Sequence, residues 1–251
     1  MKLFSSVALV ALIATGAMAA PQKKAPVRRP AAAAPAAKPA AKAAPAVYYD
    51  FKGARLGMTL DEWKAVTPPL STSAASFGGK DDGPERIWCS NDKMPDGKEI
   101  TGEFYLSDAE QALGVVACKY ARLTGSGSYH FLTSSYVKIG EYISNDVDYK
   151  FLDGKLYEIN ITGSDNLLSD IMDGLTSKFG QPTTSVNDTT QNKAGATFPH
   201  TEKTWLNPVA SIHLETPYTK INNLNVTYMA MEPITRIAAK KRELHPASDK
   251  M

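Results

Sequence analysis

One segment of the chain has the residue pattern of a β-hairpin along its whole length. It is DVDYKFLDGKLYEINIT, residues 146–162. Apolar and polar residues alternate on both sides of Asp153-Gly154, which is typical of two antiparallel strands joined by a tight turn. A one-residue slip would move every side chain of a strand to the other face, so the apolar residues select the register. They predict a three-residue loop, 152–154, with Val147 opposite Ile159 and Tyr149 opposite Tyr157.

Further strands and two helices complete the predicted fold. The other candidate strands are 86–90, 102–106, 113–120, 136–142, 203–206, 210–215 and 224–231. A first helix follows Thr59, which forms a capping box with Glu62, and ends before Pro68-Pro69. A second helix, 165–179, has an apolar stripe at helical spacing and ends at Gly180.

Short connections between consecutive strands favour antiparallel pairing. We therefore expect an α+β fold, with antiparallel sheet and two main helices packed on one face. A tandem arrangement of two helix-plus-sheet units is one option within this class.

The ends of the chain differ in composition from its middle. Residues 1–19 combine Lys2, an apolar run and the triplet Ala17-Met18-Ala19, which is typical of a signal peptide cleaved after Ala19. Residues 20–47 are mainly Ala, Pro, Lys and Arg, so we expect a disordered linker. The globular domain is then 48–232, which could divide into halves 48–145 and 146–232, and a basic tail follows at 233–251. The apolar run is too short to span a membrane, and we expect a periplasmic or secreted protein.

Charge is distributed unevenly along the chain, which has 28 Lys+Arg and 26 Asp+Glu. Seven of the basic residues lie in 1–47, where there is no acidic residue, and 233–251 contains five basic and two acidic residues. Residues 48–232 therefore carry 16 basic and 24 acidic residues. An acidic core argues against nucleic-acid binding, which requires a basic surface. The basic linker is either a solvated spacer or a contact for anionic envelope polymer.

The start of the first predicted helix also carries a family resemblance. The stretch LGMTLDEW, residues 56–63, resembles the Gly-Met-Thr-x-x-Glu/Gln-Val opening of the β-lactamase-inhibitor-protein fold and of the small outer-membrane lipoproteins of the β-barrel assembly machinery. The order helix–strands–helix–strands is similar to that of the inhibitor proteins, which repeat the unit twice. The second helix lacks the Gly-Met-Thr, and the lipoprotein cysteine is absent. The resemblance implies a non-enzymatic protein-binding module.

Two cysteines, Cys89 and Cys118, are present. An even count in an exported protein favours a structural disulfide. The alternatives are a redox pair or metal ligands, but there is no Cys-x-x-Cys motif and no histidine close to either cysteine in the sequence.

No pattern in the sequence identifies a reaction. His130, His200, His213 and His245 are not spaced as a zinc motif. His213 alternates with two apolar neighbours in a predicted strand, so it should point away from the core. The Gly-Ser loop 124–130 lacks the lysine of a phosphate loop, and the acidic loops lack the calcium-hand pattern. We predict no catalytic residue, no metal site and no cofactor.

The function that these features favour is an exported, disulfide-bonded, inhibitor-like module that binds another envelope or extracellular protein and does not span the membrane. Aromatic side chains dominate interface hot spots, so the candidate interaction residues are Trp88, Tyr136, Tyr142 and Trp205. One alternative is an envelope hydrolase with an acid or histidine site in a deep cleft. Another is a structural envelope protein that is held in place by its basic linker, with salt-sensitive binding.

Overall fold

The computed structural model describes residues 48–68, 70, 85–100, 102–126, 129–140, 142–144 and 146–246, without the side chains of 126, 129, 142–144 and 146. The expected signal peptide, 1–19, and the linker, 20–47, lie outside these residues. Within them the chain forms antiparallel sheet with helices packed on it, which confirms the α+β class at this level.

The elements follow one another along the chain as helices separated by groups of strands. The strands are β1 (Asp50–Phe51), β2 (Ala54–Arg55), β3 (Arg86–Cys89), β4 (Val116–Ser126), β5 (Tyr129–Ser134), β6 (Val137–Ile139), β7 (Tyr142–Ser144), β8 (Asp146–Leu152), β9 (Lys155–Ser164), β10 (Thr184–Gln191), β11 (Thr197–Leu206), β12 (Ala210–Thr216) and β13 (Asn223–Ala230). The helices are α1 (Leu60–Lys64), α2 (Asp108–Ala112), the 3₁₀ turn η2 (Asp165–Leu167), α3 (Leu168–Phe179) and α4 (Met231–Leu244).

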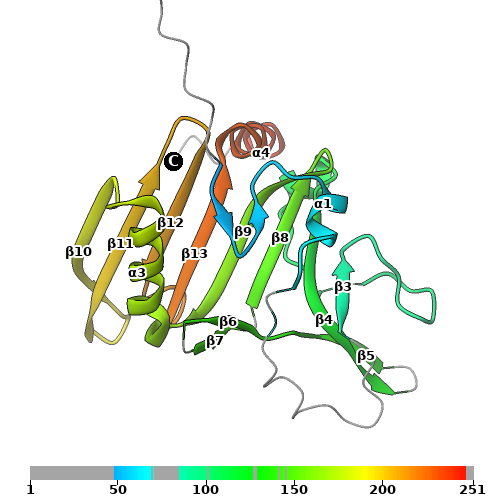
Figure 1. Cartoon of the computed structure of the whole chain (residues 1–251), viewed down its shortest axis with the longest axis horizontal. Coiled ribbons are helices and arrows are strands. Elements are labelled where there is room, and N and C mark those ends of the chain that lie inside the picture. Colours follow the sequence, from blue (N-terminus) through cyan, green and yellow to red (C-terminus); the bar gives the residue numbers. More distant parts are fainter. Residues whose placement is uncertain are drawn as a thin grey trace, which may run out of the picture. The chain divides into compact units, whose positions relative to one another are not determined.

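A nine-stranded antiparallel sheet dominates the structure, with β1–β2 and β6–β7 as separate strand pairs (Figure 1). Its order is β10-β11-β12-β13-β9-β8-β4-β3, and β5 pairs with β4. Helix α1 precedes β3, β4, β8 and β9, whereas α3 precedes β10 to β13. The two sets meet where β13 pairs with β9, with Val226 opposite Ile161.

The predicted hairpin forms as β8 and β9, but with a different register. Leu152 pairs with Lys155 around a two-residue turn, and Asp153 and Gly154 adopt φ values of 51° and 73°. This is the type I′ geometry that suits the twist of a hairpin. Tyr149 pairs with Ile159 rather than Tyr157, so the predicted three-residue loop is wrong. A β-bulge opposite Lys150 and Phe151 absorbs the extra residue, so that Leu156 joins Ile159 and Ile161 in the main core and Tyr157 turns to the other face.

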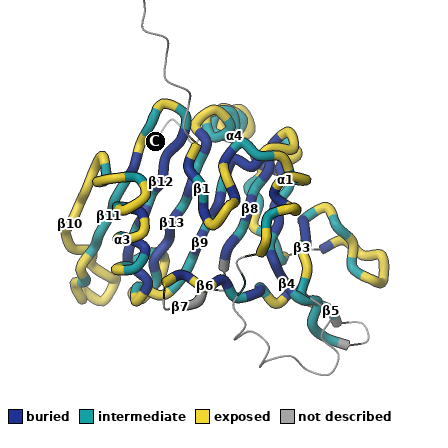
Figure 2. The backbone as a smooth tube through the Cα atoms, viewed as in Figure 1, coloured by how far each residue is buried: buried dark blue, intermediate teal, exposed yellow. Residues whose placement is uncertain are grey.

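Helices α1 and α3 lie on the same face of the sheet, as predicted (Figure 1). Trp63 of α1 and Ile171 and Leu175 of α3 belong to the main core cluster, and Trp63 is fully buried. The capping box forms, because the Thr59 hydroxyl accepts from the Glu62 N–H and the Glu62 carboxylate accepts from the Thr59 N–H. Figure 2 shows the buried centre of the sheet and the exposed edge strand β10.

Helices α2 and α4 pack on the other face. Helix α4 follows β13 directly and extends through Leu244 into the segment assigned to the basic tail, and its Ile234 and Ile237 pack against a cluster that contains Leu152 and Tyr157. Helix α2 was not predicted, although its cap Ser107 is followed by Glu110 at capping-box spacing. The predicted strand 102–106 does not form, and β5 and β10 were missed.

Candidate functional site

The sheet has one apolar and one polar face. On β9, β12 and β13 the side chains of Ile161, Leu214 and Val226 point into the main core, so the alternate residues point to the other side. Strand pairing aligns these alternate residues in two polar rows across the sheet. The first row is Asp148, Asn160, Thr227, His213 and Thr204, and the second is Thr162, Asn225, Glu215 and Glu202.

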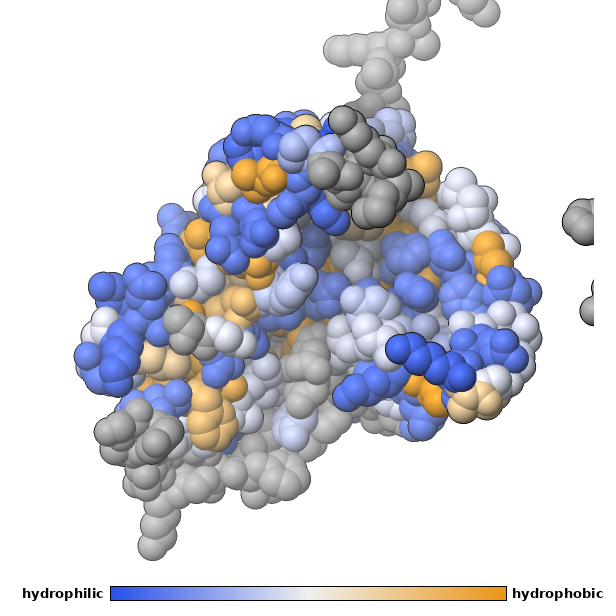
Figure 3. Space-filling model, turned by 180° about the vertical axis from the view of Figure 1, so that it is seen from behind, coloured by the Kyte–Doolittle hydropathy of each residue, from blue (hydrophilic) through white to orange (hydrophobic). Residues whose placement is uncertain are grey.

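Figure 3 shows this side of the molecule, where mainly hydrophilic side chains line a hollow in the middle of the surface. We call the two rows of side chains the polar face.

A closed hydrogen-bond network forms the centre of the polar face. Asn225 Nδ2 donates to Asn160 Oδ1 at 3.1 Å and to Thr162 Oγ1 at 3.2 Å. Thr227 Oγ1 donates to Asn225 Oδ1 at 2.7 Å and accepts from Asn160 Nδ2 at 3.2 Å. These four side chains are held by one another, with Asn225 buried and the other three partly exposed, so this part of the polar face is rigid and pre-organised for binding.

Histidines and carboxylates cluster beside this network, on β10, β11 and β12. His200 Nδ1 lies 2.6 Å from Asp188 Oδ1, and its Nε2 lies 3.8 Å from Glu215 Oε1. His213 lies 3.8 Å from a Glu202 oxygen and 3.9 Å from a Glu215 oxygen. Three carboxylates and two histidines are thus gathered in this part of the polar face.

The cluster does not have the geometry of a metal centre. Across the part of the chain that the structure describes, no group of three or more His, Cys, Asp and Glu residues could hold a metal ion. His213 is half-buried and points away from the core, as the alternation predicted.

A second charged cluster lies beneath α2 and ties this helix to the sheet. Lys150 Nζ is 2.8 Å from Glu110 Oε1 and 3.1 Å from Glu158 Oε1. Tyr157 also donates its hydroxyl to Glu110 Oε1 at 2.8 Å. Glu110 thus serves both as the capping-box carboxylate of α2 and as a partner of Lys150. Sequence reasoning missed this role, and the Ser-x-x-Glu spacing was the available signal.

Burial and pairing shift the pKa values of this cluster in different directions. Burial raises the pKa of the Glu158 carboxyl above its usual value, despite the neighbouring Lys150. For Glu110, burial also acts to raise the pKa, but hydrogen bonds from Lys150 and Ser107 outweigh it and the pKa falls. Burial likewise opposes the charge of Lys150, but Glu158 and Glu110 outweigh it and raise its pKa. The cluster is a buried structural ion pair network rather than an open reaction site.

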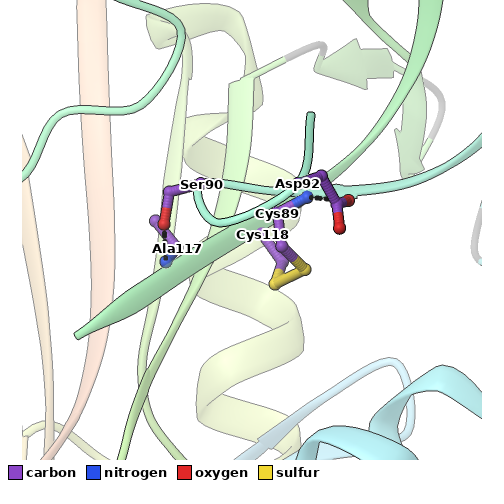
Figure 4. Close-up of a disulfide and its surroundings, with 5 residues drawn as sticks. All are labelled: Cys89, Ser90, Asp92, Ala117 and Cys118. Atoms are coloured by element: carbon purple, nitrogen blue, oxygen red, sulfur yellow. Dashed lines mark hydrogen bonds between the residues drawn. A yellow bond between two sulfur atoms is a disulfide. The ribbon is translucent and has the colours of Figure 1, made fainter. Parts of the chain in front are cut away.

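The predicted disulfide is present at the other end of the sheet. Cys89 of β3 and Cys118 of β4 are direct cross-strand neighbours, and their sulfur atoms are bonded (Figure 4). Ser90 and Asp92 support the strand end, since Ala117 N–H donates to Ser90 Oγ and Cys89 N–H donates to Asp92 Oδ2. Both cysteines are buried in the core cluster, which fits a structural role and is typical of proteins from oxidising compartments.

The aromatic residues proposed as interaction anchors have different surroundings. Trp88 and Trp205 are each 2% exposed, so neither ring is available to a partner. Each lies on the buried side of its strand, because a large ring there excludes the most apolar surface from water. Tyr136 is partly exposed, and the side chain of Tyr142 lies outside the described residues.

A different aromatic residue borders the polar face. The Phe104 ring lies 5.1 Å from the ammonium group of Lys119, which pairs with Asp148 at 4.0 Å. The next residue, Tyr105, is 86% exposed. It lies in the segment that the sequence pattern had assigned to a strand, and it is the exposed aromatic that alternation could not identify.

No protein-family model, curated protein or solved structure matched this chain when it was compared with them. Among the described residues, no helix combines the length and the apolar composition that crossing a bilayer requires.

Proposed function

We propose that this chain is an exported, non-enzymatic module that binds another envelope or extracellular protein through the polar face of its sheet. The observation that carries the proposal is the polar face itself, whose two rows extend over five adjacent strands and whose centre is a hydrogen-bonded network on β9 and β13. A rigid polar surface of this kind suits a protein partner, because little side-chain freedom is lost on binding.

The charge of the polar face specifies the chemistry of the partner. Three carboxylates, Asp188, Glu202 and Glu215, lie there beside His200 and His213. The partner would therefore present lysine or arginine side chains to β11 and β12. Tyr105, which is exposed and follows Phe104 in the chain, would supply an aromatic anchor.

The two helix-plus-strand sets would act together as a tandem unit. Their seam, β9 with β13, runs through the centre of the polar face, and the bond from Asn225 to Asn160 crosses it. The inhibitor-like fold that the Gly-Met-Thr segment suggested is part of this proposal.

The test is crosslinking and capture from an envelope extract with a chain that starts at Tyr48. We expect a stoichiometric protein partner whose capture weakens severalfold when Glu202→Gln and Glu215→Gln are combined, and also at high salt. The matched control combines Asp61→Asn and Asp173→Asn, which remove the same charge from exposed positions on α1 and α3.

The outcomes separate the proposed function from its alternatives. Equal loss of capture in the control pair would mean that overall charge, not the polar face, drives binding. The same capture is run with the mature chain, which keeps residues 20–47. Capture by the mature chain but not by the chain from Tyr48 would assign the role to the basic linker, which would then hold anionic envelope polymer. If neither the mature chain nor the chain from Tyr48 captures a protein, the result would favour the alternative of an envelope hydrolase.

A further inference from the structure

The opposite face of the sheet contains a cavity that the protein-binding proposal does not use. Its volume is about 230 Å³, and it lies between α3 and the β1–β2 hairpin, which Figure 1 shows on the same face of the sheet. Ile161 and Val226 form its floor, while Phe51, Ile171 and Leu175 line its walls. All five side chains are at most 9% exposed, so the inner part of the cavity is apolar.

Specific contacts hold the two ends of the cavity apart. At one end Lys178 of α3 donates to the Asp50 carboxylate at 2.5 Å, and the rings of Tyr49 and Phe179 pack edge to face at 4.8 Å. At the other end the turn after β6 lies directly against α3. A Cβ atom on Gly140 would come within 1.7 Å of Asp170 Oδ2, so only glycine permits this approach. The helix is thus attached at both ends, with the cavity between them.

Gly174 keeps the mouth of the cavity open. It lies within α3, where glycine is about 1 kcal/mol less favourable than alanine. Its φ is not positive, and a Cβ atom there would meet nothing within 4 Å, so neither backbone conformation nor packing requires glycine. Gly174 lines the cavity and is exposed, so a larger side chain would lie across the entrance.

We propose that this cavity binds one small apolar molecule with an uncharged polar end. An apolar cavity of about 150 Å³ accepts benzene, so by proportion this one accommodates about nine non-hydrogen atoms. The groups at the mouth are Asp50, Lys52, Asp170 and Lys178, two acids and two bases. Because their charges balance, a ligand with a net charge gains no attraction at the mouth and loses hydration on entry.

The test uses three probes with nine non-hydrogen atoms each: indole, 1-octanol and octylamine. Methyl NMR spectra of the chain from Tyr48 are recorded during titration. We expect indole and 1-octanol to bind and to shift the methyl signals of Ile161, Ile171 and Leu175. Octylamine, which is cationic, should bind at least tenfold more weakly. The methyl signals of Leu132, which lies in a separate cluster, should not move.

Two substitutions of Gly174 distinguish a blocked entrance to the cavity from a failure of the protein to fold. Gly174→Leu should weaken indole binding at least tenfold, whereas Gly174→Ala should leave it within about twofold. Both substitutions favour the helix, so neither should unfold the protein. Equal binding to the Leu variant, shifts at Leu132, or no shift with millimolar indole and 1-octanol would each overturn the proposal. The polar face lies on the opposite side of the sheet, so these outcomes leave the protein-binding test unaffected.

Discussion

At the scale of single residues, we expect the replacement of Lys150 to lower the stability of the folded protein strongly. Its side chain is 13% exposed and neutralises two carboxylates, Glu110 and Glu158, that are buried with it. A buried pair contributes little net free energy compared with apolar packing, but removing one partner leaves an uncompensated charge. The cation is retained across the acidic and neutral range, because the pKa of Lys150 is raised.

We therefore expect Lys150→Met to lower the free energy of unfolding by about 3–5 kcal/mol at pH 7. The loss should shrink as the pH falls toward 4. Without the lysine, both carboxyls would have raised pKa values in the folded state and would take up protons there before they do in the unfolded chain. Urea unfolding at pH 7 and at pH 4.5 measures both effects.

The native protein should respond to acid differently. The stabilisation by Glu110, whose pKa is lowered, is present above its unfolded value and is lost as the pH falls through the folded value. The contribution of Glu158, whose pKa is raised, depends on pH in the opposite way. It destabilises the folded state at neutral pH, and this cost disappears as the pH falls, which offsets part of the loss. Lys155→Met, on the same hairpin but exposed, is the matched control and should change stability by less than about 0.5 kcal/mol. A loss for Lys150→Met that is independent of pH would contradict the ion-pair account.

At the scale of elements, the disulfide and the capping boxes decide which short segments stay ordered. Strand β3 has four residues and pairs with β4 at the end of the sheet order. Helix α2 has five residues and depends on its Ser107–Glu110 cap and on Lys150. Neither element is long enough to be stable alone, so each depends on covalent or tertiary contacts.

Replacing both cysteines should destabilise the protein through the unfolded chain. The bond joins residues 29 positions apart, and the chain-entropy model gives about 3–4 kcal/mol for a loop of this length. We expect the combined Cys89→Ala and Cys118→Ala variant to lose about that amount in urea unfolding. The rate of backbone amide hydrogen exchange should increase first in β3, where the covalent attachment to β4 is lost. Uniform exchange across all strands would show instead that the bond stabilises the whole sheet.

At the scale of the whole molecule, the described hydrogen bonds and core clusters lie within residues 48–246. We expect a chain limited to these residues to unfold with the midpoint of the mature protein to within about 2 °C, because it retains all three core clusters of the described residues. Calorimetry on both chains makes the comparison. A chain that ends at Ala230 should lose several degrees, because α4 no longer covers Leu152 and Tyr157. Equal midpoints for all three chains would mean that α4 contributes no stability.

The sequence by itself determined the features that depend on local chemistry. The capping box at Thr59, the Gly180 helix end, the alternation of β8, β9 and β13, and the cysteine pair could all be identified from neighbouring residues. These features depend on hydrogen bonds and side-chain periodicity over a few positions, and each was found in the structure, except that the bulge moved Tyr157 away from the face predicted for it. They were sufficient for the α+β class and for two helices on one face.

Only the tertiary structure decided what depends on contacts between distant segments. The bulge at Tyr157, the ion pairs of Lys150 with Glu110, and the burial of Trp88 and Trp205 follow from packing between different elements. The polar face needs the register of five strands, and the cavity needs α3, β1 and β6 to meet. Local propensity cannot specify these arrangements, because their free energy comes from surface that is buried only when separate elements come together.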